Sequence, residues 1–216
     1  MSFVVTIAQR KGGSGKSTLA CQLTAALLAD GLTVLGVDTD EQASFSEWAL
    51  RRMDRGDDDG RFAVETVAGY GVASTIRRGE RFADVIIVDT APSLDTTVKQ
   101  AIRAADLVLT PMQLSPLDLE ATMPTARLIG DVRKEPLFVI NRAPPRARIA
   151  DMIRAEIKRH GLPLAPAELG NRAAFSESLA SGRGVVETAP SSRAAEEMRA
   201  LAAVVTKRLD AVSAAA

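Results

Sequence analysis

A glycine-rich run near the N-terminus has the residue types and spacing of a phosphate-binding loop. It follows an apolar stretch and opens a helical pattern. Glycines let the backbone wrap around a phosphate and direct N–H groups inward, and a helix N-terminus adds positive potential. A lysine at this place reaches terminal phosphates, and a hydroxyl binds Mg²⁺. The run therefore predicts a nucleoside triphosphate site with Mg²⁺. Its residues are Gly12, Gly13, Ser14, Gly15, Lys16, Ser17 and Thr18.

The start of this loop departs from the usual phosphate-loop pattern. In G-x-x-x-x-G-K-[ST] the first glycine would stand where the chain has Arg10. Lys11 stands five residues before Lys16, so the loop would bring two ammonium groups near one triphosphate. The alternative is a plain glycine-rich turn with an exposed lysine. We favour the phosphate site because strand, loop, lysine, hydroxyl and helix occur together in this order.

Aspartates follow two further apolar runs. Asp89 ends the run Val85–Val88, which is the Walker B arrangement, and we expect it to hold Mg²⁺ through water. Asp38 and Asp40 follow the run Thr33–Val37. Carboxylates at such strand ends can order the water shell of Mg²⁺, and an attack on the γ-phosphorus needs a positioned water. A polar turn at a strand end is the alternative.

The elements that would position these residues alternate along the chain. Short runs rich in Val, Ile and Leu do not alternate with polar residues, which is typical of parallel strands buried on both faces. These runs are Phe3–Ala8, Thr33–Val37, Val85–Val88, Leu107–Thr110 and Leu137–Ile140. Helical patterns cover Lys16–Ala29, Ser115–Asp131, Ile149–His160 and Ser192–Leu209. The alternation predicts an α/β fold, with a mostly parallel twisted sheet flanked by helices on both faces and one domain over residues 1–216.

Composition excludes several other classes of protein. Hydrophobic residues make up 46% and charged residues 25%, so the chain is not disordered. Cys21 is the only cysteine and His160 the only histidine, which excludes zinc-finger spacing and an internal disulfide. The apolar runs are far shorter than the ~18 residues of a membrane span, and the N-terminus carries no leader pattern. These features predict a cytoplasmic protein.

Charge is balanced overall but differs between the two parts of the chain. Residues 1–132 hold 13 basic and 18 acidic residues, whereas residues 133–216 hold 14 and 9. The second part can therefore face a polyanion. The alternative is a solvated surface whose arginines pair with Glu156, Glu168 and Glu177. The candidate contacts are Arg146, Arg148, Arg154, Lys158, Arg159, Arg172, Arg183 and Arg193.

The segment Lys11–Thr18 is similar to the loop KGGxGK[ST] of the ParA/MinD family of deviant Walker A ATPases. The resemblance covers nearly the whole chain and is closest to the short ParF-like ParA proteins. It implies that Lys11 reaches across a dimer interface to the partner subunit's nucleotide. It also implies that Asp38 supports the Mg²⁺ shell and that Asp40 orients the attacking water. The family's D-P-Q reads Asp40-Glu41-Gln42 here, so its proline is missing.

The same resemblance implies where the base of ATP binds. Pro111 begins a segment similar to the proline-rich segment that helps form the dimer interface and the base pocket. Asn141 and Arg142 match a family position beside the adenine. An asparagine can bond the base edge and a guanidinium can stack on its face. A common strand-end turn is the alternative for this pair.

As a whole, the resemblance implies a Mg²⁺-dependent ATPase whose ATP-bound homodimer binds DNA without sequence preference. A ParB-like or other cargo-bound activator would stimulate hydrolysis and so position a plasmid, a chromosome locus or a protein assembly on the nucleoid. Neither the helix-turn-helix of large ParA proteins nor a membrane-targeting helix is expected. The alternatives are a small-molecule ligase or kinase on the same fold, a MinD-like positioning ATPase that does not act on DNA, and a non-enzymatic nucleotide-gated scaffold.

Overall fold

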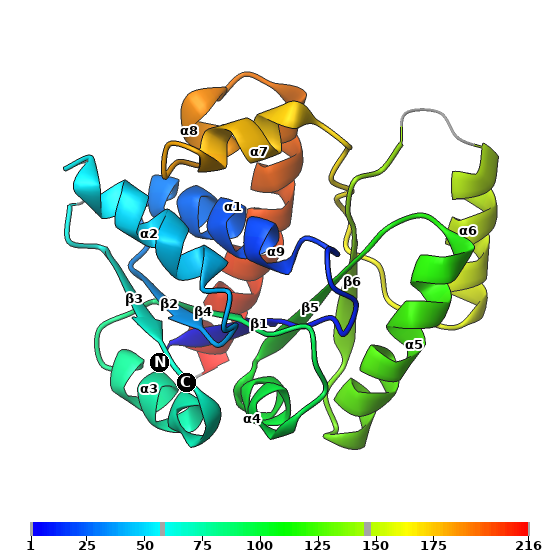
Figure 1. Cartoon of the computed structure of the whole chain (residues 1–216), viewed down its shortest axis with the longest axis horizontal. Coiled ribbons are helices and arrows are strands. Elements are labelled where there is room, and N and C mark those ends of the chain that lie inside the picture. Colours follow the sequence, from blue (N-terminus) through cyan, green and yellow to red (C-terminus); the bar gives the residue numbers. More distant parts are fainter. Residues whose placement is uncertain (1, 57–58, 145–147, 216) are drawn as a thin grey trace.

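A parallel sheet forms the centre of the molecule in the computed structural model, which describes residues 2–56, 59–144 and 148–215 (Figure 1). Its strand order is β3-β2-β4-β1-β5-β6, and every neighbouring pair is parallel. The strands are β1 (Phe3–Ile7), β2 (Val34–Asp38), β3 (Phe62–Thr66), β4 (Val85–Asp89), β5 (Leu107–Met112) and β6 (Pro136–Ile140).

Helices cover both faces of this sheet. One face carries α1 (Lys16–Ala29), α2 (Ser44–Asp54), α7 (Ala173–Leu179), α8 (Val185–Thr188) and α9 (Arg193–Ala215). The other carries α3 (Val72–Gly79), which follows the short helix η1 (Gly69–Gly71), and α4 (Thr96–Ala104), α5 (Pro116–Asp131) and α6 (Arg148–Arg159). The predicted α/β class is confirmed. No helix among the described residues is both long enough and apolar enough to span a bilayer.

The strands are apolar on both sides because both faces are covered. In β1, Val5 belongs to the core cluster beneath α1 and α9, whereas Val4 belongs to the cluster with α3 and α4. Successive strand residues point to opposite faces, so a strand between two helical layers needs apolar residues at every position. β2 and β4 each end in an aspartate, Asp38 and Asp89, at the carboxyl edge of the sheet, where β1 leads into the glycine-rich loop.

Several predicted boundaries agree with the structure. The helix Lys16–Ala29 is α1, and Ser115 caps α5, where its hydroxyl accepts the N–H of Asp118. The final helix packs into the core through residues such as Met198 and Leu201. The sequence patterns did not predict β3, α3, α4, α7 or α8. β3 is an edge strand whose side chains run from buried Phe62 to exposed Thr66, and the four helices have only 4 to 9 residues, too few for a helical period to repeat often.

Candidate functional site

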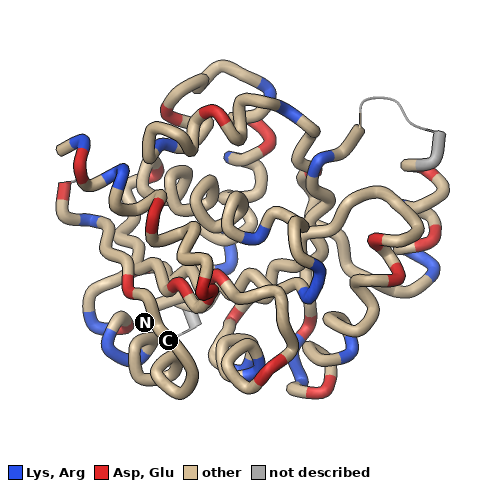
Figure 2. Tube along the Cα trace, viewed as in Figure 1, with Lys and Arg blue, Asp and Glu red and all other residues tan. Residues whose placement is uncertain are grey.

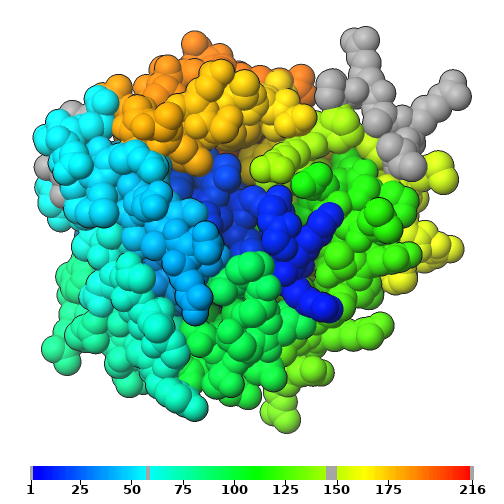
Figure 3. Space-filling view, viewed as in Figure 1, coloured from blue at the N-terminus to red at the C-terminus, as the bar shows by residue number. Residues whose placement is uncertain are grey.

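The glycine-rich loop joins the end of β1 to the start of α1. Gly13 and Gly15 adopt φ angles of 72° and 94°, a left-handed conformation that favours glycine. A Cβ at Gly15 would also collide with the side-chain amide of Asn141. The carbonyl of Gly15 accepts the N–H of Leu19 at 2.9 Å, which begins α1. Figure 3 shows this segment in dark blue at the floor of a hollow between the segments drawn in light blue, gold and green.

Parallel pairing brings the predicted acids together beside Lys16. Asp38 and Asp89 are direct register partners on β2 and β4, and Asp89 is also the partner of Ile7 on β1. Lys16 opens α1 and is 6% exposed. Burial lowers the pKa of its ammonium group, while the charges of Asp89 and Asp40 raise it. A buried ammonium group can exchange its lost hydration for contact with an anion, and the nearby carboxylates would then need a cation such as Mg²⁺ to offset their charge.

Asp89 is the most strongly perturbed acid of the site. Neither of its buried carboxylate oxygens has a hydrogen-bond partner of good geometry among the described residues. Burial raises the pKa of this carboxyl to about 7, assisted by the charges of Asp38 and Asp40, whereas the Ser17 hydroxyl and Lys16 lower it. An unpartnered carboxylate beside a serine hydroxyl fits a hydrated Mg²⁺ ion, since Mg²⁺ commonly uses few protein ligands together with phosphate and water.

Asp38 and Asp40 have different surroundings although they stand two residues apart. Asp38 is fully buried, and its two oxygens accept the N–H groups of Asp40 at 3.1 Å and of Ser46 at 2.9 Å. It therefore fixes the turn after β2 and the first turn of α2. The Asp40 carboxylate accepts the N–H of Gln42 at 3.0 Å and faces the hollow above the loop. In the described part of the chain, no cluster of three or more His, Cys, Asp or Glu residues could hold a metal.

Two adjoining hollows follow the loop. The first has a volume of about 490 Å³ and lies over the loop, with Lys16, Asp40 and Pro92 in its wall. The second has a volume of about 450 Å³ and lies between α1, the end of β6, the segment 169–173, α7 and α9. Thr18 and Arg142 line both hollows. A ligand with a phosphate chain and a flat base can therefore extend from the first hollow into the second.

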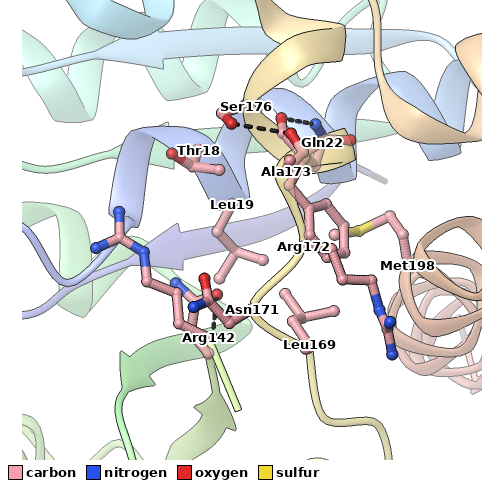
Figure 4. Close-up of a pocket in the computed structure, with 13 residues that line it drawn as sticks. Thr18, Leu19, Gln22, Arg142, Leu169, Asn171, Arg172, Ala173, Ser176 and Met198 are labelled. Atoms are coloured by element: carbon pink, nitrogen blue, oxygen red, sulfur yellow. Dashed lines mark hydrogen bonds between the residues drawn. The ribbon is translucent and has the colours of Figure 1, made fainter. Parts of the chain in front are cut away.

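The second hollow includes residues that the sequence patterns did not indicate. Figure 4 shows Arg142 and Asn171 at one end and Gln22 and Ser176 at the other. Thr18, Asn141 and Arg142 were expected at the nucleotide, whereas the other members come together only because the fold brings α1 beside the segment after residue 168, which no local pattern indicates. Its further members are Thr18, Leu19, Asn141, Leu169, Gly170, Arg172, Ala173, Phe175 and Met198.

The predicted base-binding residues are placed unequally. Asn141 lies between β6 and the loop, where its Nδ2 donates to the carbonyl of Ser14 at 2.9 Å and its Oδ1 accepts the N–H of Arg142 at 2.9 Å. Arg142 has a φ of 53° and borders both hollows. Pro111 is buried within β5, where its carbonyl accepts the side-chain amide of Gln9, and it is not among the described residues that line either hollow.

Lys11 lies apart from Lys16. Its Nζ atom is 2.8 Å from a carboxylate oxygen of Asp118 at the start of α5. The Lys11 side chain remains 38% exposed, and it is not among the described residues of the first hollow. The two lysines of the loop therefore face different surroundings. Lys16 is buried beside Asp89, whereas Lys11 lies at the surface, where it pairs with Asp118 of α5.

The basic residues of the second part of the chain are mostly paired with acids. Arg154 contacts Glu168 at 2.7 Å, Arg172 contacts Glu197 at 2.6 Å, and Arg159 pairs with Glu156. Figure 2 shows acidic and basic residues interspersed on this side of the molecule. Arg193 also approaches Glu197, at 3.4 Å. Arg146 lies outside the described residues, as does the side chain of Arg148. Several of the arginines predicted to contact DNA are thus paired with acids, as the alternative expected. Glu156 and Glu168 pair as expected, and Glu197 is a further acidic partner that was not expected.

The fold and the loop together define a P-loop nucleotide-binding protein, because a buried strand delivers the glycine-rich loop to a helix N-terminus and a neighbouring strand delivers the acid. Residues 5–185 match the family described as the CobQ/CobB/MinD/ParA nucleotide binding domain. The chain belongs to this family, as the resemblance at Lys11–Thr18 predicted.

Similar proteins extend over most of the chain. It is 27% identical over 204 residues to the Maintenance of carboxysome distribution protein A of Halothiobacillus neapolitanus, covering 91% of this chain and 92% of that protein. It is 31% identical over 158 residues to Protein ParA of Rhizobium radiobacter, covering 73% and 68%. A putative plasmid partition protein of Borrelia burgdorferi, solved with AMPPNP, has the same fold with a TM-score of 0.72, at 19% identity and covering 96% and 100%.

Proposed function

We propose that this protein is a Mg²⁺-dependent ATPase that dimerises around ATP and positions a cargo. The observation that carries the proposal is the separation of the two loop lysines. Lys16 is buried at the phosphate hollow of its own chain, whereas Lys11 lies outside that hollow at the surface. A second subunit can approach an exposed lysine, so Lys11 is suited to contact the nucleotide of a partner.

Each polar residue of the site has a role in this proposal. Lys16 and the loop amides bind the terminal phosphates, Thr18 and Arg142 join the phosphate hollow to the base hollow, and Asn141 holds the loop against β6. The surroundings of Mg²⁺ are formed by Ser17 and Asp89, and by Asp38 through the turn after β2. The ion would neutralise phosphate charge. Asp40 faces the hollow and orients the attacking water.

The cargo and the surface on which it moves are further parts of the proposal. Relatives named for plasmid partition and for carboxysome distribution support a role in positioning. The ATP-bound homodimer binds DNA without sequence preference, and a ParB-like or other cargo-bound protein stimulates hydrolysis and releases it. In the cell the protein is then cytoplasmic and associated with the nucleoid.

A second candidate is a positioning ATPase that acts on protein alone. The ion pairs of Arg154, Arg159 and Arg172 favour it, because a guanidinium already paired with a carboxylate adds little net charge for a DNA phosphate. Both candidates share the ATP cycle. A ligase or kinase on the same fold would instead require a small-molecule acceptor before ATP is consumed.

The test of the ATP cycle uses size and phosphate release together. With ATP and Mg²⁺, the wild type should double its mass in light scattering and release phosphate slowly without any added acceptor. Lys11→Ala should bind ATP but stay monomeric, whereas Lys207→Ala, which removes an exposed lysine on α9, should behave as wild type. A Lys11→Ala protein that dimerises normally, or a wild type that needs an acceptor, would contradict the proposal.

A further inference from the structure

The ion pair of Lys11 engages a carboxylate that the rest of α5 holds in place. Asp118 is 5% exposed, although it lies in the first turn of a surface helix. The hydroxyl of Ser115 donates to one of its carboxylate oxygens at 2.6 Å and accepts its backbone N–H at 3.1 Å. The other carboxylate oxygen contacts Nζ of Lys11 at 2.8 Å. The carboxylate is thus fixed and aimed at the lysine before any partner is present.

The residues just before Lys11 are bound to the same helix. The side-chain amide of Gln9 donates to the hydroxyl of Thr122 at 2.8 Å, and the hydroxyl of Thr125 donates to the amide oxygen of Gln9 at 2.9 Å. The backbone N–H of Arg10 donates to Thr125 at 3.1 Å. One face of α5 therefore holds the chain from the end of β1 up to the ammonium group of Lys11.

The surface beside this pair has an apolar residue open to solvent. Leu117 precedes Asp118 and is 75% exposed, one of few large apolar side chains so exposed in the described part of the chain. An exposed leucine next to a paired lysine is suited to contact a second copy of the chain, because burial of both would occur in one step.

We propose that Asp118 is a positioning residue that retains Lys11 on its own subunit and thereby opposes ATP-dependent dimerisation. This inference rests on the dimer of the proposed function. Lys11 can reach the partner's triphosphate in two ways. If it leaves Asp118, the ion pair is lost. If it keeps the ion pair, the Asp118 carboxylate lies near the phosphates and repels them. In either case the carboxylate raises the dimer dissociation constant, and cargo-bound activators have a contact to act upon.

The expected size of this effect follows from the exposure of the pair. A partly exposed ion pair changes an equilibrium by about two- to fivefold, or ~0.4–1 kcal/mol. A symmetric dimer uses both lysines, so the effect enters twice. Loss of the Asp118 charge should therefore tighten the dimer by about four- to twenty-five-fold.

The experiment compares Asp118→Asn with wild type by sedimentation velocity, in AMPPNP and Mg²⁺ over a range of protein concentrations. Asparagine keeps the shape and can still accept the hydrogen bond from Ser115. Glu120→Gln is the matched control, since it removes an exposed carboxylate from the same helix. We expect a dimer dissociation constant at least fourfold lower for Asp118→Asn, unchanged for Glu120→Gln, and the same AMPPNP affinity of the monomer in all three proteins.

Two failures can be told apart in this experiment. If wild type forms no dimer with AMPPNP, the proposed function fails. If wild type dimerises and the Asp118→Asn constant is equal or higher, Asp118 does not oppose dimerisation and this inference is overturned. Thermal unfolding checks that Asp118→Asn is folded. If Asp118→Asn is unfolded, Asp118→Ser, which also removes the charge, is measured in its place.

Discussion

At the scale of single residues, the site is defined by polar groups that the fold leaves without a complete set of partners. Among the described residues the buried Asp89 carboxylate has no hydrogen bond of good geometry, and Lys16 is buried beside it. Burial of each charged group costs free energy, which a ligand of opposite charge would offset. Asp38 differs because two backbone N–H groups satisfy it.

The raised pKa of Asp89 predicts how stability depends on pH without metal or nucleotide. Because its pKa is about 7 in the folded protein and near 4 when unfolded, the folded state holds the extra proton between these values. The free energy of unfolding should therefore fall as pH rises through this range. Asp89→Asn should gain about 2–3 kcal/mol relative to wild type between pH 5 and pH 8, measured by urea unfolding in EDTA. A difference independent of pH would refute this.

Asp40→Ala should separate binding from hydrolysis. The carboxylate faces the hollow, while the contacts that hold the turn come from Asp38, so the variant should bind ATP and dimerise as wild type does. Loss of water orientation should lower phosphate release by ~10²-fold or more. The neighbouring exposed acid provides the control, since Glu41→Ala should keep full activity. If Asp40→Ala released phosphate at the wild-type rate, another group would have to orient the attacking water.

At the scale of elements, α7 and α8 are linked by hydrogen bonds and an ion pair to α1 and α2. The helix α1 follows the glycine-rich loop, and α2 follows the turn after β2. Gln22 of α1 donates to the carbonyl of Phe175 at 2.7 Å and accepts the N–H of Val185 at 2.8 Å. On the other side, Arg52 of α2 contacts Glu187 of α8 at 2.8 Å. These bonds couple α7 and α8 to α1 and α2, and α7 also lines the second hollow through Ala173, Phe175 and Ser176.

Gln22→Leu tests this connection. The substitution removes the side-chain acceptor of the Val185 N–H, whereas the carbonyl of Phe175 keeps the hydroxyl of Ser178 as a donor. An unsatisfied buried group costs about 1–3 kcal/mol. We expect a loss of about 1–3 kcal/mol in unfolding free energy, together with weaker ATP binding. Gln100→Leu should not lower stability, because the buried amide oxygen of Gln100 has no hydrogen-bond partner among the described residues to lose. Equal effects of both variants would contradict the assigned role.

At the scale of the whole molecule, charge bears on whether the proposed dimer binds DNA. The chain has 27 basic and 27 acidic residues, and several arginines of the second part are paired with acids. Within one subunit these paired arginines add little net charge toward a duplex. Two subunits double these contacts, so DNA binding should depend on assembly rather than on any one residue.

DNA affinity should accordingly require ATP, ignore base sequence and fall with salt. Each neutralised phosphate contributes a slope of about −0.9 in log K against log salt. Fluorescence anisotropy on unrelated duplexes, with ATP or ADP across a salt series, measures all three properties. Equal binding with ADP and ATP, or no salt dependence, would favour the positioning ATPase that acts on protein alone.

Local chemistry made the loop and much of the fold predictable from the sequence. Phosphate binding needs contiguous residues, so Gly12 to Thr18 indicate it without further context, and strands buried on both faces are visible as unbroken apolar runs. Parallel strands end at one edge of a sheet, which is why the aspartates after separate strands could be expected together. The edge strand β3 was not predicted because it is only partly buried, and the short helices were not predicted because 4 to 9 residues hold too few repeats of a helical period.

Only the tertiary structure decided which partner each charged residue has. Lys11 meets Asp118, Asn141 holds the carbonyl of Ser14, and Arg172 turns to Glu197, all through segments far apart in the chain. Residue types fix which groups can attract one another, but an ion pair or hydrogen bond forms only between atoms within a few ångströms. Those distances are set by how the helices pack on the sheet, so no spacing along the sequence could supply them.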